Sequence, residues 1–170
     1  AIRFAESGVR AMGRNAAGVR GIRVPGDEDV ISLITPDADG LILTASENGF
    51  GKLTPVEDFP LHGRGGQGVI AMQTSERNGR LVAATQVSTS DELMLMSSSG
   101  TLVRTRAGEI SVLGRNTQGV RLIRLDEGER LILFYGAANR DSAVFPDPER
   151  FDVRRDPNHH VGFGGPGPHF

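Results

Sequence analysis

Short apolar runs alternate with glycine-containing turns along the first 130 residues. Residues 41–44 and 93–96 are apolar, and each run leads into a turn sequence, Ser-Glu-Asn-Gly or Ser-Ser-Ser-Gly, that is typical of a β-hairpin. Residues 81–87 and 30–34 are further strand candidates, bounded by Asn-Gly, Asp or Pro. No apolar run approaches the ~18 residues of a membrane-spanning helix. The pattern therefore predicts many short strands joined by turns.

One phrase occurs three times with a period of about fifty residues. It reads GRNAAGVRGIRV from Gly13, GRGGQGVIAM from Gly63 and GRNTQGVRLIRL from Gly114. Flanking segments keep the same phase, since Asn48-Gly49-Phe50 aligns with Ser99-Gly100-Thr101. Strand-rich repeats of ~40–50 residues are the units of propeller-like folds, in which one unit cannot bury its apolar face alone. We therefore predict an all-β repeat.

The composition narrows the class of protein further. The chain has 170 residues, of which 38% are hydrophobic and 24% charged, as in a globular protein. It contains no cysteine, which excludes disulfides, thiolate catalysis and cysteine-ligated metal centres, and which fits a cytoplasmic location. Six of the nine aromatic residues lie between Phe134 and Phe170, so we expect a boundary between residues 126 and 140.

The net charge is only −2, but the basic residues are clustered. Residues 3–24 contain five arginines against Glu6, and residues 101–125 contain five against Glu109. Of the basic residues up to position 130, only Lys52 is a lysine. Because the rigid fork of arginine suits phosphate oxygens, the bias favours a phosphate-rich partner.

If the equivalent loops of successive units lie on one rim, their arginines form a basic track that binds duplex DNA through its backbone. The alternative is that these arginines pair with nearby acids as an ordinary solvated surface. The Gly-Arg pair recurs at the same position of all three repeats, which favours DNA binding over an ordinary solvated surface. The candidate DNA-binding residues are Arg10, Arg14, Arg20, Arg23, Arg64, Arg104, Arg106, Arg115, Arg121 and Arg124.

These phrases resemble the C-terminal domain of the DNA gyrase A protein. The resemblance covers residues 1–131 and rests on SGVRAMGRNAAGVRGIRV, SERNGRLVAATQV and TLVRTRAGEISVLGRNTQGVRLIRL. It implies a β-pinwheel, a propeller-like disc whose basic perimeter wraps duplex DNA and supports ATP-dependent negative supercoiling in the whole enzyme. The rest of gyrase is then a partner in the parent protein.

Two departures from this family limit what the chain does alone. The signature basic box, Gln-Arg-Arg-Gly-Gly-Lys-Gly, is missing, and His62-Gly63-Arg64-Gly65-Gly66-Gln67-Gly68 resembles a weaker copy of it. The DNA-cleaving part of the gyrase A protein is missing too, and Tyr135, the one tyrosine, lies outside the resemblance. We expect no catalytic residues and no enzyme activity from this chain by itself.

From about residue 132 the repeat gives way to a glycine- and proline-rich tail. Residues 132–170 resemble the haem-proximal segment of cytochrome P-450 monooxygenases through Ala138-Asn139-Arg140-Asp141, Phe163-Gly164 and His169. The segment stops before the cysteine ligand of that family, so we expect no bound haem. The alternative to DNA binding is a chimeric fold without native activity, in which the tail only completes the β structure.

Other motifs add no cofactor or metal. The two Gly-x-Gly-x-x-Gly patterns, from Gly63 and from Gly162, lack the strand and helix that nucleotide binding requires, and His159-His160 has no third ligand at metal-site spacing. We expect residues 129–135 to form a strand that packs against Leu122 and Ile123. Open β-edges of a partial disc also predict possible self-association.

Overall fold

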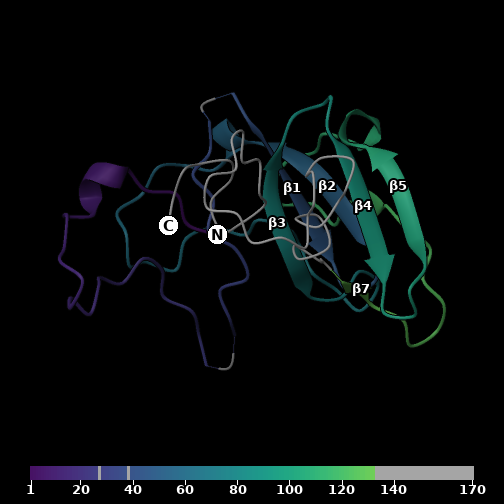
Figure 1. Cartoon of the computed structure of the whole chain (residues 1–170), viewed down its shortest axis with the longest axis horizontal. Coiled ribbons are helices and arrows are strands. Elements are labelled where there is room, and N and C mark those ends of the chain that lie inside the picture. Colours follow the sequence, from purple (N-terminus) through teal and green to yellow (C-terminus); the bar gives the residue numbers. More distant parts are fainter. Residues whose placement is uncertain (27, 38, 133–170) are drawn as a thin grey trace, which may run out of the picture.

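Two antiparallel sheets make up the fold (Figure 1). The computed structural model describes residues 1–26, 28–37 and 39–132. The strands are β1 (Leu41–Ser46), β2 (Phe50–Pro55), β3 (Leu81–Val87), β4 (Glu92–Ser97), β5 (Leu102–Arg106), β6 (Val120–Arg121) and β7 (Leu131–Ile132). Three short 3-10 turns are η1 (Glu6–Gly8), η2 (Val56–Asp58) and η3 (Ala107–Glu109). Among the described residues there is no α-helix, which confirms the all-β prediction.

Each sheet combines strands from successive units of the repeat. The first sheet has the order β3-β1-β2-β6 and the second has the order β5-β4-β7. The β1–β2 and β4–β5 hairpins lie where the turn sequences predicted them, and β3 covers the predicted strand 81–87. In both sheets the outer strand beside the hairpin, β3 or β7, comes from the following unit.

The prediction of a strand at residues 30–34 is wrong. This segment forms no β-ladder, and Val30 and Leu33 are 61% and 64% exposed. In the repeat, the equivalent strands β3 and β7 pair with the hairpin of the preceding unit. The described residues before position 30 form no such hairpin, so residues 30–34 lack a partner strand. The segment is tied to the sheet by the Ser32 hydroxyl, which donates to the carbonyl of Ala84 at 2.7 Å.

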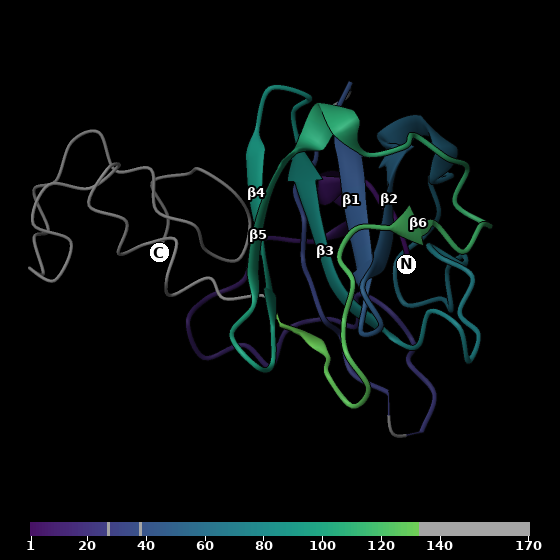
Figure 2. The same cartoon turned by 90° about the vertical axis from the view of Figure 1, so that its right-hand side faces the viewer.

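Strand β1 is buried on both faces, which explains its nearly continuous apolar sequence. Leu43 and Ala45 point towards the second sheet, where they join clusters with residues of η3, β4 and β7. Ile42 points the opposite way and packs with Val56, Phe59 and Ala71. Stacking of one unit on the next therefore builds the core (Figure 2).

The last strand described supports the expectation for residues 129–135. Leu131 and Ile132 pair with Ser97 and Met96, and the Leu131 side chain is buried in one cluster with Ile123. The prediction is confirmed for this part of the segment. Residues 133–135 and the rest of the haem-proximal resemblance lie outside the described residues. No helix in the described part of the chain has the length and apolar character needed to cross a membrane.

Candidate nucleic-acid interface

Two of the three Gly-Arg loops, 63–68 and 114–119, are attached to the preceding unit by the same backbone contacts. Parallel bridges join Arg3 with Leu61 and Leu53 with Val112, positions that correspond in the repeat. The amide of His62 donates to Arg3 O at 2.8 Å, and the amide of Leu113 donates to Leu53 O at the same distance. The loops 63–68 and 114–119 therefore sit at equivalent places on successive units.

The last glycine of each loop is required by a close backbone approach. Gly68 and Gly119 have φ angles of 74° and 77°, a conformation that favours glycine. A Cβ at Gly119 would lie 2.6 Å from the carbonyl oxygen of Gly51, and one at Gly68 would overlap the carbonyl of Ala1. The repeated glycine thus reflects contact between the loop and the neighbouring unit.

The repeated Gly-Arg arginines also bind the neighbouring unit. Arg64 donates to the carbonyls of Gly8 (2.9 Å) and Arg20 (3.2 Å), and Arg115 donates to the carbonyl of Ile70 (3.2 Å). Arg20 and Ile70 are corresponding positions, so Arg64 and Arg115 repeat one contact. This contact holds each guanidinium at a fixed place on its loop, a role that the charge pattern did not reveal.

Nine of the ten predicted arginines are exposed, and Arg115 is half-buried. Within the described residues, most of them have side chains that make no hydrogen bond or ion pair: Arg10, Arg14, Arg20, Arg23, Arg106, Arg121 and Arg124. The structure brings Arg64 against the backbone of Arg20. Arg104 and Arg106 lie on the second sheet, whereas Arg121 lies on the first.

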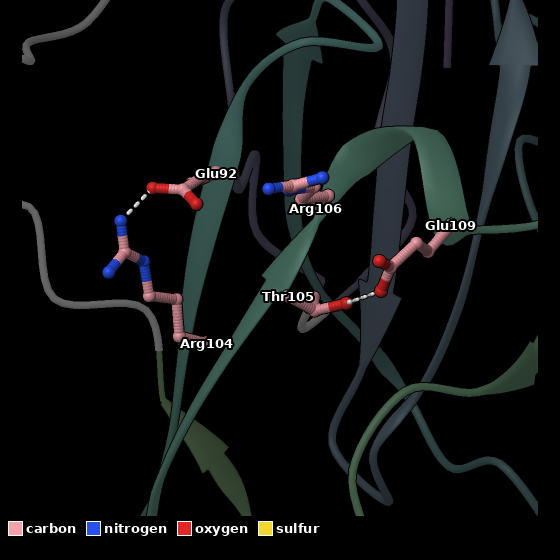
Figure 3. Close-up of a pocket in the computed structure, with 5 residues that line it drawn as sticks. All are labelled: Glu92, Arg104, Thr105, Arg106 and Glu109. Carbon is pink, nitrogen blue, oxygen red and sulfur yellow. Dashed lines mark hydrogen bonds and ion pairs between the residues drawn. The ribbon is translucent and has the colours of Figure 1, made fainter.

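Arg104 and Arg106 lie in a different setting from the loop arginines. They line a shallow polar hollow on the β4–β5 hairpin together with Glu92, Thr105 and Glu109 (Figure 3). Arg104 pairs with Glu92, and Thr105 donates to Glu109 at 3.4 Å. Arg104 therefore follows the alternative interpretation, in which arginines pair with nearby acids. The two carboxylates offset the charge that would attract phosphate.

Arg121 lies over an aromatic ring. Its Cζ atom is 5.3 Å from the centroid of Phe50, the residue that faces it across the β2–β6 pairing. Arg77, which the charge clusters did not include, lies 4.9 Å from the same centroid. Only the fold could show that Arg77 and Arg121 lie over the same ring, because Arg77 is distant in sequence from both charge clusters and follows Glu76.

Lys52 is buried beneath the loop that carries Arg115. Its side chain is fully covered, and Nζ donates to the carbonyls of Gly114 (2.7 Å), Arg115 and Thr117 (3.2 Å) and contacts the Thr117 hydroxyl (3.1 Å). Burial lowers the pKa of Lys52 to about 8, although Asp58 opposes the shift. Sequence analysis missed this role. The signal was a lysine at a position where the other units have Ile2 and Val103.

The arrangement suits binding of an extended anion better than chemistry at one point. In the part of the chain that the structure describes, no three acidic or histidine side chains gather as a metal site would require. The loops 63–68 and 114–119 present guanidinium groups at equivalent places on successive units, and guanidinium groups match phosphate oxygens in geometry.

Similarity to known proteins agrees with this arrangement. The chain matches the family described as DNA gyrase C-terminal domain, beta-propeller, over residues 1–37, 40–88 and 91–134. It is 61% identical to the DNA gyrase A protein of Pseudomonas aeruginosa and 53% identical to that of Escherichia coli, each over 131 residues. These matches cover 77% of the chain but only 14% and 15% of the relatives. The chain thus spans about a seventh of their length.

Solved structures support the same assignment. A DNA gyrase A C-terminal domain superposes with a TM-score of 0.69 and 27% identity, covering 76% of this chain and 44% of that one. The C-terminal domain of a DNA topoisomerase IV superposes with a TM-score of 0.68 and 26% identity, covering 76% and 41%. The predicted propeller-like fold is therefore confirmed. The chain belongs to the family of the DNA gyrase C-terminal domain.

Proposed function

We propose that this chain binds duplex DNA through its phosphate backbone, without base specificity, and wraps it as a non-catalytic module of a gyrase-type topoisomerase. In this role its partners are duplex DNA and the remainder of gyrase, in the cytoplasm. The DNA contacts are the ten predicted arginines, with those on the loops and on β6 contributing more than Arg104 and Arg106.

One observation carries this proposal. Equivalent backbone bonds fix the Gly-Arg loops at the same place on successive units, and the arginines around them are mostly exposed and unpaired among the described residues. Spacing by a structural repeat presents positive charge at regular intervals. A long duplex, which has phosphates at regular intervals, is the anion that such a surface fits.

A salt titration of duplex binding tests the proposal. The logarithm of the binding constant is expected to fall linearly with the logarithm of salt concentration, by about 0.9 per phosphate contacted. The double variant Arg115→Gln/Arg121→Gln is expected to flatten the slope by about one to two units. Arg130→Gln is the matched control, because Arg130 is exposed but paired with Glu47. Absence of duplex binding at low salt would overturn the proposal.

Wrapping needs its own measurement. A nicked plasmid is sealed by ligase with and without the protein, and the linking number is compared after the protein is removed. A change in linking number that grows with protein concentration supports wrapping. Binding without such a change would reduce the function to DNA binding alone.

We also infer that the chain divides near residue 131. The 1–131 part comprises two full repeats and part of a third, and residues 132–170 are a segment that resembles the haem-proximal region of cytochrome P-450 enzymes. The support for the segment is its sequence, and the family match to the gyrase domain ends at residue 134. The coding DNA across codons 126–135 tests the fusion, which a continuous gyrase reading frame would contradict.

A further inference from the structure

Two arginines from separate segments lie over one phenyl ring. Phe50 begins β2 and is 3% exposed, with Arg77 and Arg121 both lying over it. Since each guanidinium carbon lies about 5 Å from the same ring centroid, the two are no more than about 10 Å apart. Both arginine residues are exposed. Two positive charges therefore share one small patch of surface.

The backbone around Arg77 is fixed by hydrogen bonds on both sides. The Asn48 side-chain amide donates to the carbonyls of Glu76 (3.2 Å) and Arg77 (3.3 Å). Asn78 is fully buried, and its side chain donates to Gln73 O (2.8 Å) and Gln118 O (3.2 Å). The bond from Asn78 to Gln118 O joins the turn that carries Arg77 to the loop that leads into Arg121. The backbones of both arginines are therefore linked by hydrogen bonds.

Neither guanidinium is neutralised within the described residues. Arg77 and Arg121 make no hydrogen bond or ion pair there, whereas Arg104 pairs with Glu92 and Arg130 with Glu47. Stacking on a ring uses the flat face of a guanidinium and leaves its N–H groups at the edge free to donate. Because neither arginine has an ion-pair partner there, each N–H edge can bind one phosphate of the DNA backbone.

The repeat itself does not need this arrangement. In the copy of this junction that is formed by the Arg3–Leu61 bridge, the position of Arg121 is occupied by Ile70. Both copies nevertheless form the same parallel bridge between units. The Phe50 ring and its two arginines are therefore additional to what holds the units together.

We propose that Arg77 and Arg121, held over Phe50, form a phosphate-binding pair that contacts the DNA backbone, and that Arg77 is a DNA contact in its own right. This inference rests on the proposed function. The ring and the Asn48 and Asn78 bonds keep both guanidiniums in place before DNA arrives, which reduces the ordering needed on binding.

The test compares salt slopes for a fixed duplex. Arg77→Gln is expected to lower the slope by about 0.9 and Arg77→Gln/Arg121→Gln by about twice that, since one phosphate contact is lost with each arginine. Arg77→Lys keeps the charge, so its slope is expected to stay near that of the wild type. Arg130→Gln, an exposed arginine with an acidic partner, is the control.

The outcomes separate this inference from the function on which it rests. If the wild type binds duplex with a steep slope and Arg77→Gln changes neither slope nor affinity, the phosphate-binding pair is wrong while DNA binding stands. If the wild type binds no duplex, the proposed function fails. Thermal melting checks each variant, and Arg77→Met, which can still cover the ring, replaces Arg77→Gln if that variant is unfolded. A slope equal to that of the wild type in Arg77→Met would then overturn the inference.

Discussion

The β1–β2 and β4–β5 hairpins occupy equivalent positions in the repeat but have different surroundings. Leu43 and Leu53 of the first hairpin are 5% and 0% exposed, because η3 of the next unit packs on them. Their counterparts on the second hairpin, Met94 and Arg104, are exposed. The same backbone is thus a core element in one place and a surface in the other. Burial in this fold is supplied by the neighbouring unit.

Removing a core side chain from only one hairpin is expected to give the largest effect. Leu53→Ala leaves a cavity in the cluster with Leu43 and Val87 and is expected to lower the free energy of unfolding by about 3 kcal/mol. Arg104→Ala, at the equivalent position, is expected to change it by less than about 0.5 kcal/mol. Urea unfolding measures both. Similar losses for the two variants would contradict the comparison.

The preceding position on each strand, Lys52 or Val103, gives a smaller contrast. Lys52→Met removes the donor for three loop carbonyls and is expected to cost about 2 kcal/mol, since these partly buried carbonyls lose a charged hydrogen-bond partner. Val103→Met, its counterpart, is expected to cost less than about 1.5 kcal/mol. The measurement is again urea unfolding. Equal stability of Lys52→Met and wild type would show that the loop satisfies its carbonyls without the ammonium.

The third contrast is a pH dependence that arises in the first hairpin. The pKa of Lys52 is lowered from 10.5 to about 8 in the folded chain, so between these values the unfolded chain binds more protons. The contribution of Lys52 to stability is therefore expected to rise with pH from about 8 to about 10.5 and to be flat below that window. The wild-type curve minus the Lys52→Met curve isolates this contribution. A difference that falls with rising pH would contradict the sign.

Turn chemistry and periodicity predicted the parts of the fold that depend on local sequence. The hairpins follow from Asn48-Gly49 and Ser99-Gly100, and β3 follows from an apolar run after Asn78-Gly79. Residues 30–34 have a similar local pattern but form no strand. A strand depends on the backbone beside it, and the sequence of the segment itself carries no information about that partner.

The candidate interface was predictable in outline only. Clusters of arginine indicated where positive charge lies in the sequence, and most of those side chains are exposed. The pairing of Arg104 with Glu92 needed the register of β4 with β5, which places residue 92 opposite residue 106 and makes Arg104 its diagonal neighbour on the same face. The role of Lys52 depends on a contact with Gly114, 62 positions away, and that of Arg77 on a contact with Phe50, 27 positions away. The sequence alone does not show which distant residues come together.

The buried ammonium of Lys52 also bears on how such repeats diverge after duplication. The loop whose carbonyls it binds belongs to the next unit. The lysine and the loop are therefore about sixty residues apart in the sequence but form one hydrogen-bonded contact between units. A loop copied onto the first unit would meet Ile2 and find no donor for its carbonyls. We expect position 52 and the 114–117 loop to be inherited and exchanged together, and a graft of that loop onto residues 63–66 to succeed only when Ile2 is changed to lysine with it.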